Sequence, residues 1–167
     1  MKKPLILFLL ASAMVISSCR RDDDDETSQL TGLAAFLNGE FEVTRADYNG
    51  SLQTPLSNIP MAGTGTGTVG TYNFKAASNK VDYQVSSNME IEIPVIGQIP
   101  VPINVDGSGN ISYTSSTQFV IDDPTYGPMT YNISDKTSNS LVATTRYVND
   151  TTLGTVDLLL DIYLEKK

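Results

Sequence analysis

Few residues of this chain are able to do chemistry, because its 167 residues include no histidine and a single cysteine, Cys19. Without histidine, serine and cysteine nucleophiles lose their usual base near neutral pH, and most zinc and copper sites lose their ligands. One thiol cannot form an internal disulfide, so Cys19 needs another role. We therefore expect a protein that is not an enzyme, that holds no metal or cofactor, and whose cysteine is modified.

Pairs of carboxylates are the other groups that could catalyse a reaction. Glu90 and Glu92 share one face of an expected strand and stand about 7 Å apart at a rise of roughly 3.3 Å per residue, a separation that suits glycoside hydrolysis. Asp122 and Asp123 precede Pro124. The chain has no tryptophan on which a sugar could stack. We interpret both pairs as solvated side chains of strands and turns.

The residues before Cys19 have the pattern of a secretory signal. Lys2 and Lys3 are followed by an uncharged apolar run over 5–14, which is shorter than the roughly 20 residues that cross a bilayer. The run leads into Val-Ile-Ser-Ser-Cys at 15–19, which resembles the lipobox of bacterial lipoproteins. The resemblance implies cleavage before Cys19 and attachment of several acyl chains, which together give a stable membrane anchor. The alternative is a chance cysteine after an ordinary signal peptide.

Five consecutive carboxylates follow the cysteine: Asp22, Asp23, Asp24, Asp25 and Glu26. They repel one another, so we expect a solvated, extended tether that lacks the fixed geometry of a calcium site. An acidic run at this place resembles the export signal of surface lipoproteins of the Bacteroidota type, which implies a position on the cell surface. Arg20 and Arg21 depart from that pattern. The alternative is a plain spacer, with the domain on the periplasmic face of the outer membrane.

These segments divide the chain into a signal peptide (1–18), a lipidated acidic tether (19–29) and one domain (30–167). A domain of this length can bury a substantial core. Removal of Lys2 and Lys3 with the signal leaves nine basic and nineteen acidic residues, a net charge of −10. Such a chain has no electrostatic attraction to nucleic acid.

The domain alternates apolar and polar residues over most of its length, which predicts strands. Helical spacing over 30–37 predicts one or two helical turns that end at Asn38-Gly39. We expect a first strand over 40–44, a long polar loop over 49–68, strands from 69 onward, and a hairpin turn at 106–110. This pattern predicts an all-β fold, an antiparallel meander of eight to ten strands that closes into a barrel and so removes its free edges.

A short helix followed by Asn38-Gly39-Glu40-Phe41-Glu42-Val43 and a run of strands resembles the lipocalin-like domains of lipoproteins from the same bacteria. Phe41 stands where those domains usually have tryptophan, and Val43 fits the apolar position two places on. The resemblance implies a lipocalin-like β-barrel with an internal cavity for a small apolar ligand. Aromatic side chains with an apolar body, most of them with a polar tip, are our candidates for its lining: Tyr83, Tyr113, Phe119 and Tyr131.

One hairpin, over 93–102, stays apolar where loops are normally polar. Val95, Ile96 and Ile99 are its candidate contact residues, and its prolines block ladder hydrogen bonds, so we expect a projecting edge. An exposed apolar patch would mark a ligand portal or a surface for a protein partner. The alternative is that the hairpin folds over the barrel end and closes the core.

Two functions follow from these observations. The first is an outer-membrane, lipid-anchored protein that holds a small apolar or amphipathic ligand in its barrel. The second is a structural or accessory subunit of a cell-surface complex that binds no small molecule.

Overall fold

Each alternating stretch of the sequence forms a strand with its apolar side chains inside. The structure, a computed structural model, describes residues 32–93 and 97–167. The elements, in chain order, are α1 (Gly32–Leu37), β1 (Gly39–Gln53), β2 (Asn58–Thr64), β3 (Thr66–Lys75), the 3₁₀ turn η1 (Ala76–Ser78), β4 (Lys80–Ile93), β5 (Gly97–Ser115), β6 (Gln118–Asp123), β7 (Gly127–Ser134), β8 (Ser140–Thr151) and β9 (Gly154–Lys166).

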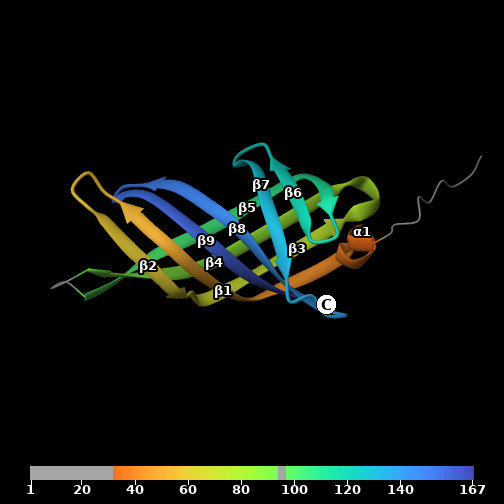
Figure 1. The fold of residues 1–167 in the computed structure, drawn as a ribbon, viewed down its shortest axis with the longest axis horizontal. Helices are drawn as coiled ribbons and strands as arrows, with labels where there is room; N and C mark the ends of the chain where they lie inside the picture. The colour runs from red at the N-terminus through yellow and green to blue at the C-terminus, as the bar shows by residue number, and fades with distance from the viewer. Residues whose placement is uncertain (1–31, 94–96) are drawn as a thin grey trace, which may run out of the picture.

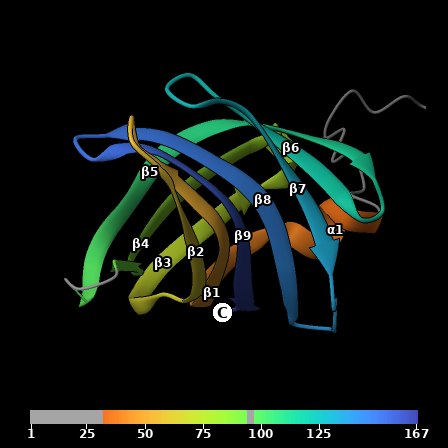
Figure 2. The same cartoon turned by 60° about the vertical axis from the view of Figure 1, so that its left-hand side comes forward.

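The strands form one closed antiparallel sheet (Figures 1 and 2). Neighbours pair in the order β2-β1-β3-β4-β5-β6-β7-β8-β9, and β1 pairs with β9 along most of its length, which closes the ring. β3 pairs with the start of β1 and β2 pairs with its end, so β2 and β3 together flank one edge of β1. The predicted antiparallel meander of eight to ten strands, closed into a barrel and preceded by a short helix, is confirmed.

The barrel interior has an aromatic half and an aliphatic half. In the aromatic half, Phe41 and Phe119 pack edge-on against Phe74, and Phe119 stacks on Tyr131 with ring centroids 4.8 Å apart. The other half is filled mainly by buried aliphatic side chains, among them Leu52, Met61, Met89, Ile91, Val101, Ile103, Val156, Leu158 and Leu160. Such packing gives most of the favourable free energy of folding.

The short helix α1 packs at the aromatic end of the barrel (Figure 1). A six-residue helix is not stable alone, so α1 depends on packing for its stability. Leu33 and Leu37 are buried, and the Phe36 and Phe41 rings lie 5.9 Å apart. Lys166 Nζ donates a hydrogen bond to the Phe36 carbonyl at 3.0 Å, which ties the last strand to the helix.

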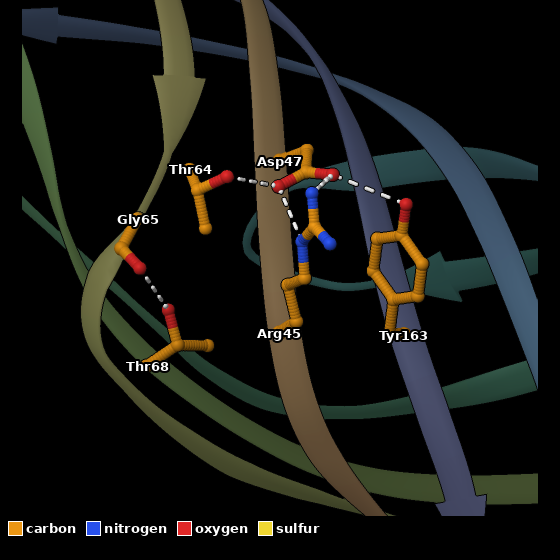
Figure 3. Close-up of polar contacts among 6 residues, drawn as sticks. All are labelled: Arg45, Asp47, Thr64, Gly65, Thr68 and Tyr163. Atoms are coloured by element: carbon orange, nitrogen blue, oxygen red, sulfur yellow. Dashed lines mark hydrogen bonds and ion pairs between the residues drawn. The ribbon is translucent and has the colours of Figure 1, made fainter.

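Outside the barrel, Asp47 joins three strands near the break between β2 and β3 (Figure 3). Its carboxylate accepts hydrogen bonds from Arg45 Nε at 2.8 Å, Thr64 Oγ1 at 2.7 Å and Tyr163 Oη at 3.1 Å. The Arg45 guanidinium also lies over the Tyr163 ring, 4.9 Å from its centroid. Across the break, Thr68 Oγ1 donates to the Gly65 carbonyl at 3.2 Å. These contacts hold β1, β2 and β9 together where the ladder between β1 and the β2–β3 segment is interrupted.

Two local predictions are wrong. Residues 49–68 are not a long loop, because β1 extends to Gln53 and β2 returns beside it. Residues 106–110 are not a turn, because β5 runs straight through them and Gly107 pairs with Tyr83. A side chain at Gly107 would meet the Tyr83 hydroxyl and the Asp123 carboxylate. Glycine is therefore needed there for space, not for a reversal of the chain.

The predicted signal peptide, Cys19 and the acidic run from Asp22 to Glu26 lie outside the described residues. Among the helices of ranges 32–93 and 97–167, none is long and apolar enough to cross a membrane.

Candidate functional site in the barrel wall

The wall of the barrel has a notch, because two of its strands are short. β6 pairs with β5 only over residues 110–115 of β5, and β7 pairs with β8 only between 132–134 and 142–144. The β6–β7 hairpin thus fills the wall near α1 but leaves β5 and β8 without a ladder between them farther along (Figures 1 and 2). Short strands in the middle of a closed sheet therefore produce a side opening.

A cleft of about 700 Å³ occupies this notch. Its volume falls in the range of small-molecule sites, roughly 300–1,000 Å³. Its lining combines residues of β5, of the β6–β7 hairpin and of β8: Val105, Thr125, Tyr126, Pro128, Met129, Thr130, Arg146, Tyr147, Val148, Asn149 and Asp150. Tyr126 is 41% exposed and Val148 is 54% exposed, so the cleft offers apolar surface at its mouth.

Asp123 fixes the tip of the β6–β7 hairpin at the edge of the cleft. Its Oδ1 accepts the backbone N–H groups of Thr125 at 2.7 Å and Tyr126 at 3.0 Å, and its Oδ2 accepts the Tyr83 hydroxyl at 2.8 Å. Burial by itself raises the pKa of Asp123, but these hydrogen bonds outweigh burial and lower it below its ordinary value. Burial, and after it the Asp123 carboxylate, raise the pKa of the Tyr83 phenol. Asp123 is therefore a buried anion that positions one side of the cleft.

Behind the cleft lies a small inner cavity of about 30 Å³. Val105, Met129, Arg146 and Tyr147 line both spaces, so the two adjoin. The cavity sits where the aromatic and aliphatic halves of the core meet, and its other lining residues include Tyr72, Val85, Met89, Ile103, Tyr131, Thr145 and Leu160. About one or two water-sized groups fit in such a volume.

Thr145 is the unusual residue of the inner cavity. Its side chain is on the inward face of β8 and is 5% exposed. Its buried Oγ1 has no hydrogen-bond partner within the described part of the chain. A buried hydroxyl without a partner costs roughly 1–3 kcal/mol, and native proteins contain few such groups.

The charged groups beside the cleft are paired on its outer side. Arg146 Nε and Nη2 donate to Asp157 at 2.9 and 2.7 Å, and that hydrogen bonding raises the pKa of Arg146 and lowers that of Asp157. Asp150 accepts a hydrogen bond from Thr155 at 2.6 Å. The arrangement therefore offers apolar surface, one buried hydroxyl without a partner and no unpaired cation among the described lining residues.

The structure places the four predicted lining residues in different surroundings. Tyr131 lines the inner cavity, and burial raises its pKa to about 12. Tyr83 and Phe119 belong to the aromatic cluster, and Tyr83 is held by Asp123. Tyr113 is half-buried on β5, and its hydroxyl has no partner in the described ranges.

Asp123 and Thr145 are the residues that sequence reasoning missed. Asp123 is buried, 2% exposed, although we expected a solvated turn residue. Thr145 could have been noticed, because it falls in line with Leu141 and Ala143 on the inward face of a strand, where a hydroxyl is out of place.

Of the predicted contact hairpin, Val95 and Ile96 lie outside the described residues. Ile99 is half-buried and pairs with Ile91 in the β4–β5 ladder. Pro100 and Pro102 are exposed within β5, in the stretch that has no β6 partner, as expected for prolines on a free strand edge.

Among the described residues there is no group of three potential metal ligands. No protein-family model matches the chain, and no curated protein matches it. Among solved structures, a siderocalin, Ex-FABP, described as functioning through dual ligand specificities, is similar with a TM-score of 0.40 at 8% identity, over 78% of this chain and 74% of that one. A deswapped triple mutant of bovine odorant binding protein is similar with a TM-score of 0.36 at 13% identity, over 78% and 74% of the two chains. Neither similarity bears on what this chain binds.

Proposed function

We propose that this protein is a lipid-anchored binding protein of the bacterial outer membrane that holds a small apolar or amphipathic ligand, and that it is not an enzyme. The observation that carries the binding function is the side opening of the barrel, whose cleft of about 700 Å³ adjoins an inner cavity. The pattern around Cys19 supports the anchor, and the acidic run from Asp22 to Glu26 supports the cell surface over the periplasmic face.

The ligand is expected to sit in the cleft and not deep in the barrel. The packed interior leaves only about 30 Å³, whereas a molecule of ten heavy atoms needs several times that volume. Val105, Met129 and Tyr147 give the cleft an apolar floor, and methionine adapts its shape readily to different ligands. Burial of apolar ligand surface there is favourable by roughly 25 cal/mol per Å².

The test is binding of N-phenyl-1-naphthylamine, a dye that fluoresces in apolar surroundings, to the purified full-length chain. We expect saturable binding at one site per chain. Val105→Trp should abolish it, because an indole at this position fills the floor of the cleft. The matched control is Val69→Trp, since Val69 lies on β3 and is 62% exposed; it should bind as the wild type does.

Two results would contradict the proposal: no dye binding by the wild type, or equal binding by both tryptophan variants. Absence of binding would favour the accessory subunit of a surface complex. Circular dichroism of each variant establishes that its barrel is folded.

A further inference from the structure

We infer that Thr145 is a specificity-determining residue, and that the ligand is a neutral amphipathic molecule whose single small hydrogen-bonding group, an alcohol or a carbonyl, enters the inner cavity and bonds to Thr145 Oγ1. This inference rests on the proposed binding function and specifies which end of the ligand goes inward. Two observations carry it: the unpartnered hydroxyl of a residue that is 5% exposed, and the cavity of about 30 Å³ that this residue lines beside the cleft.

The other buried polar side chains around the cavity already have partners. Ser87 Oγ and Thr68 Oγ1 lie 2.7 Å apart, and the hydroxyls of Tyr72 and Tyr131 lie 3.4 Å apart. Among the buried side chains that line the cavity, Thr145 is therefore left as the one whose hydroxyl a ligand can satisfy. Because a threonine hydroxyl both donates and accepts, it suits an alcohol or a carbonyl equally.

A trapped water does not explain the site as well. Buried waters typically make about three hydrogen bonds to protein groups. Here a water would find one unpaired buried hydroxyl, and its other buried neighbours are apolar or already bonded. A ligand differs because its apolar body, held in the cleft, keeps its polar tip in place without further hydrogen bonds.

A charged group does not fit the inner cavity. A buried carboxylate needs a cation or several donors. Arg146, the charged residue among the described lining, directs its guanidinium to Asp157 on the outer face and is largely exposed, with 66% of its side chain accessible. The cavity therefore selects an uncharged tip, and a fatty carboxylate is expected to keep its head in solvent.

Of the four residues that line both the cleft and the cavity, three are half-buried and lie along the path between them: Val105, Met129 and Tyr147. Methionine has three rotatable bonds, so a change of the Met129 rotamer is a low-cost way to let a one- or two-atom group through to Thr145.

The test compares Thr145→Val with the wild-type full-length chain in displacement of N-phenyl-1-naphthylamine by three probes: 1-octanol, n-nonane and octanoate. Valine has the shape of threonine without the hydroxyl. Thr145→Val should raise the dissociation constant of 1-octanol relative to that of n-nonane by about three- to tenfold, because the variant loses one hydrogen bond to the alcohol. The ratio removes the general hydrophobic difference between the probes. Octanoate affinity should not change.

The free protein should respond in the opposite way. Replacement of an unsatisfied buried hydroxyl by a methyl group removes a desolvation cost, so the midpoint of thermal unfolding of Thr145→Val should rise by about 3 °C. The matched control is Thr144→Val, on the same strand but the outer face, where Oγ1 donates to Asp161 at 2.6 Å. It should lower the midpoint and leave all three probe affinities as in the wild type.

Each outcome separates this inference from the function on which it rests. A wild type that binds no dye contradicts the proposed function itself. Dye binding with an alcohol-to-alkane ratio that Thr145→Val leaves unchanged overturns the inference alone. A Thr145→Val variant less stable than the wild type also overturns it, since the hydroxyl would then already be satisfied. Octanoate weakened to the same extent as 1-octanol would show that the cavity admits charged tips.

Discussion

At the scale of single residues, two neighbouring aspartates show how far local environment can diverge. Asp122 points outward from β6 and is exposed, whereas Asp123 points inward, is 2% exposed and accepts three hydrogen bonds. Successive residues of a strand face opposite sides of the sheet, so one carboxylate is solvated and the next is part of the core. The charge of Asp123 is stabilised by donors from three different residues and not by a cation.

This difference predicts a pH effect on stability. The folded state holds the pKa of Asp123 below its ordinary value, which is about 3.9 in the unfolded chain. As the pH falls below about 4, the unfolded chain takes up the proton first, so the stability present above that pH is lost. Asp123→Asn should lower the free energy of unfolding by about 1–2 kcal/mol at pH 7 and make its decline toward pH 3 shallower.

Urea unfolding between pH 7 and pH 3 measures both effects. Asp122→Asn is the control, because an exposed side chain is expected to change stability by less than about 0.5 kcal/mol. A pH dependence that is identical in the wild type and Asp123→Asn would show that this carboxylate does not contribute to it. Asp47 keeps part of the acid sensitivity in the variant, since its pKa is also lowered: burial opposes this, but hydrogen bonds from Arg45 and Thr64 outweigh burial.

At the scale of elements, the barrel has a second place where strands meet without a ladder. β2 and β4 lie side by side in space but are not paired in the sheet. The Tyr48 hydroxyl, from β1, reaches between them, accepts the Glu90 N–H at 2.8 Å and donates to the Glu90 carbonyl at 3.1 Å. One phenol thus takes the role that a neighbouring strand would have at Glu90.

Loss of the Tyr48 hydroxyl should destabilise the edge of β4 around Glu90. Tyr48→Phe leaves both backbone groups of Glu90 without a protein partner, which is expected to cost about 1–3 kcal/mol of unfolding free energy. It should also raise the amide exchange rate of Glu90, measured by hydrogen–deuterium exchange. Tyr126→Phe, at an exposed tyrosine of the β6–β7 hairpin, is the matched control and should match the wild type. Unchanged exchange at Glu90 would rule out the bridging role.

The two places where neighbouring strands lack ladder hydrogen bonds, β2 beside β4 and β5 beside β8, differ in what fills the gap between the strands. Tyr48 bridges the gap between β2 and β4, whereas the gap between β5 and β8 holds the candidate binding cleft. The cleft contains no hydrogen bond that joins its two walls among those of the described residues. A ligand can therefore enter between β5 and β8 without breaking the barrel ladder.

At the scale of the whole molecule, we propose that the lipid anchor and the acidic run determine where the domain operates. Cys19→Ala should abolish incorporation of a clickable palmitate. Replacement of Asp22 to Glu26 by serine and glycine should leave the fold unchanged, because solvated carboxylates that repel one another stabilise nothing. If the run directs export, the wild type should be cut by protease added to whole cells while the replaced variant is protected.

Label retained in Cys19→Ala would contradict the lipobox interpretation. Equal digestion of wild type and variant would show that the acidic run is only a spacer. Protection of both would place the domain on the periplasmic face, provided that the protease cuts both in lysed cells. Arg20 and Arg21 merit a separate substitution, because they interrupt the export pattern.

The sequence by itself determined the all-β class, the short helix at the start of the domain and the inward faces of most strands. It did so because alternation of apolar and polar residues is local information, which the pleat of a strand converts directly into two faces. It also suggested the aromatic side chains inside, since Phe119 and Tyr131 fall on those faces. The cysteine and the acidic run are likewise local patterns.

Only the tertiary structure decided which strands are too short for their neighbours, and hence where the wall opens. A strand's length is local, but the length of its ladder depends on a partner that lies far away in the sequence. The same holds for Asp123, whose burial depends on Tyr83 forty residues away, and for Gly107, which makes room for both. Thr145 lacks a hydrogen-bond partner for the same reason: its surroundings come from six other strands, and no stretch of sequence contains them together.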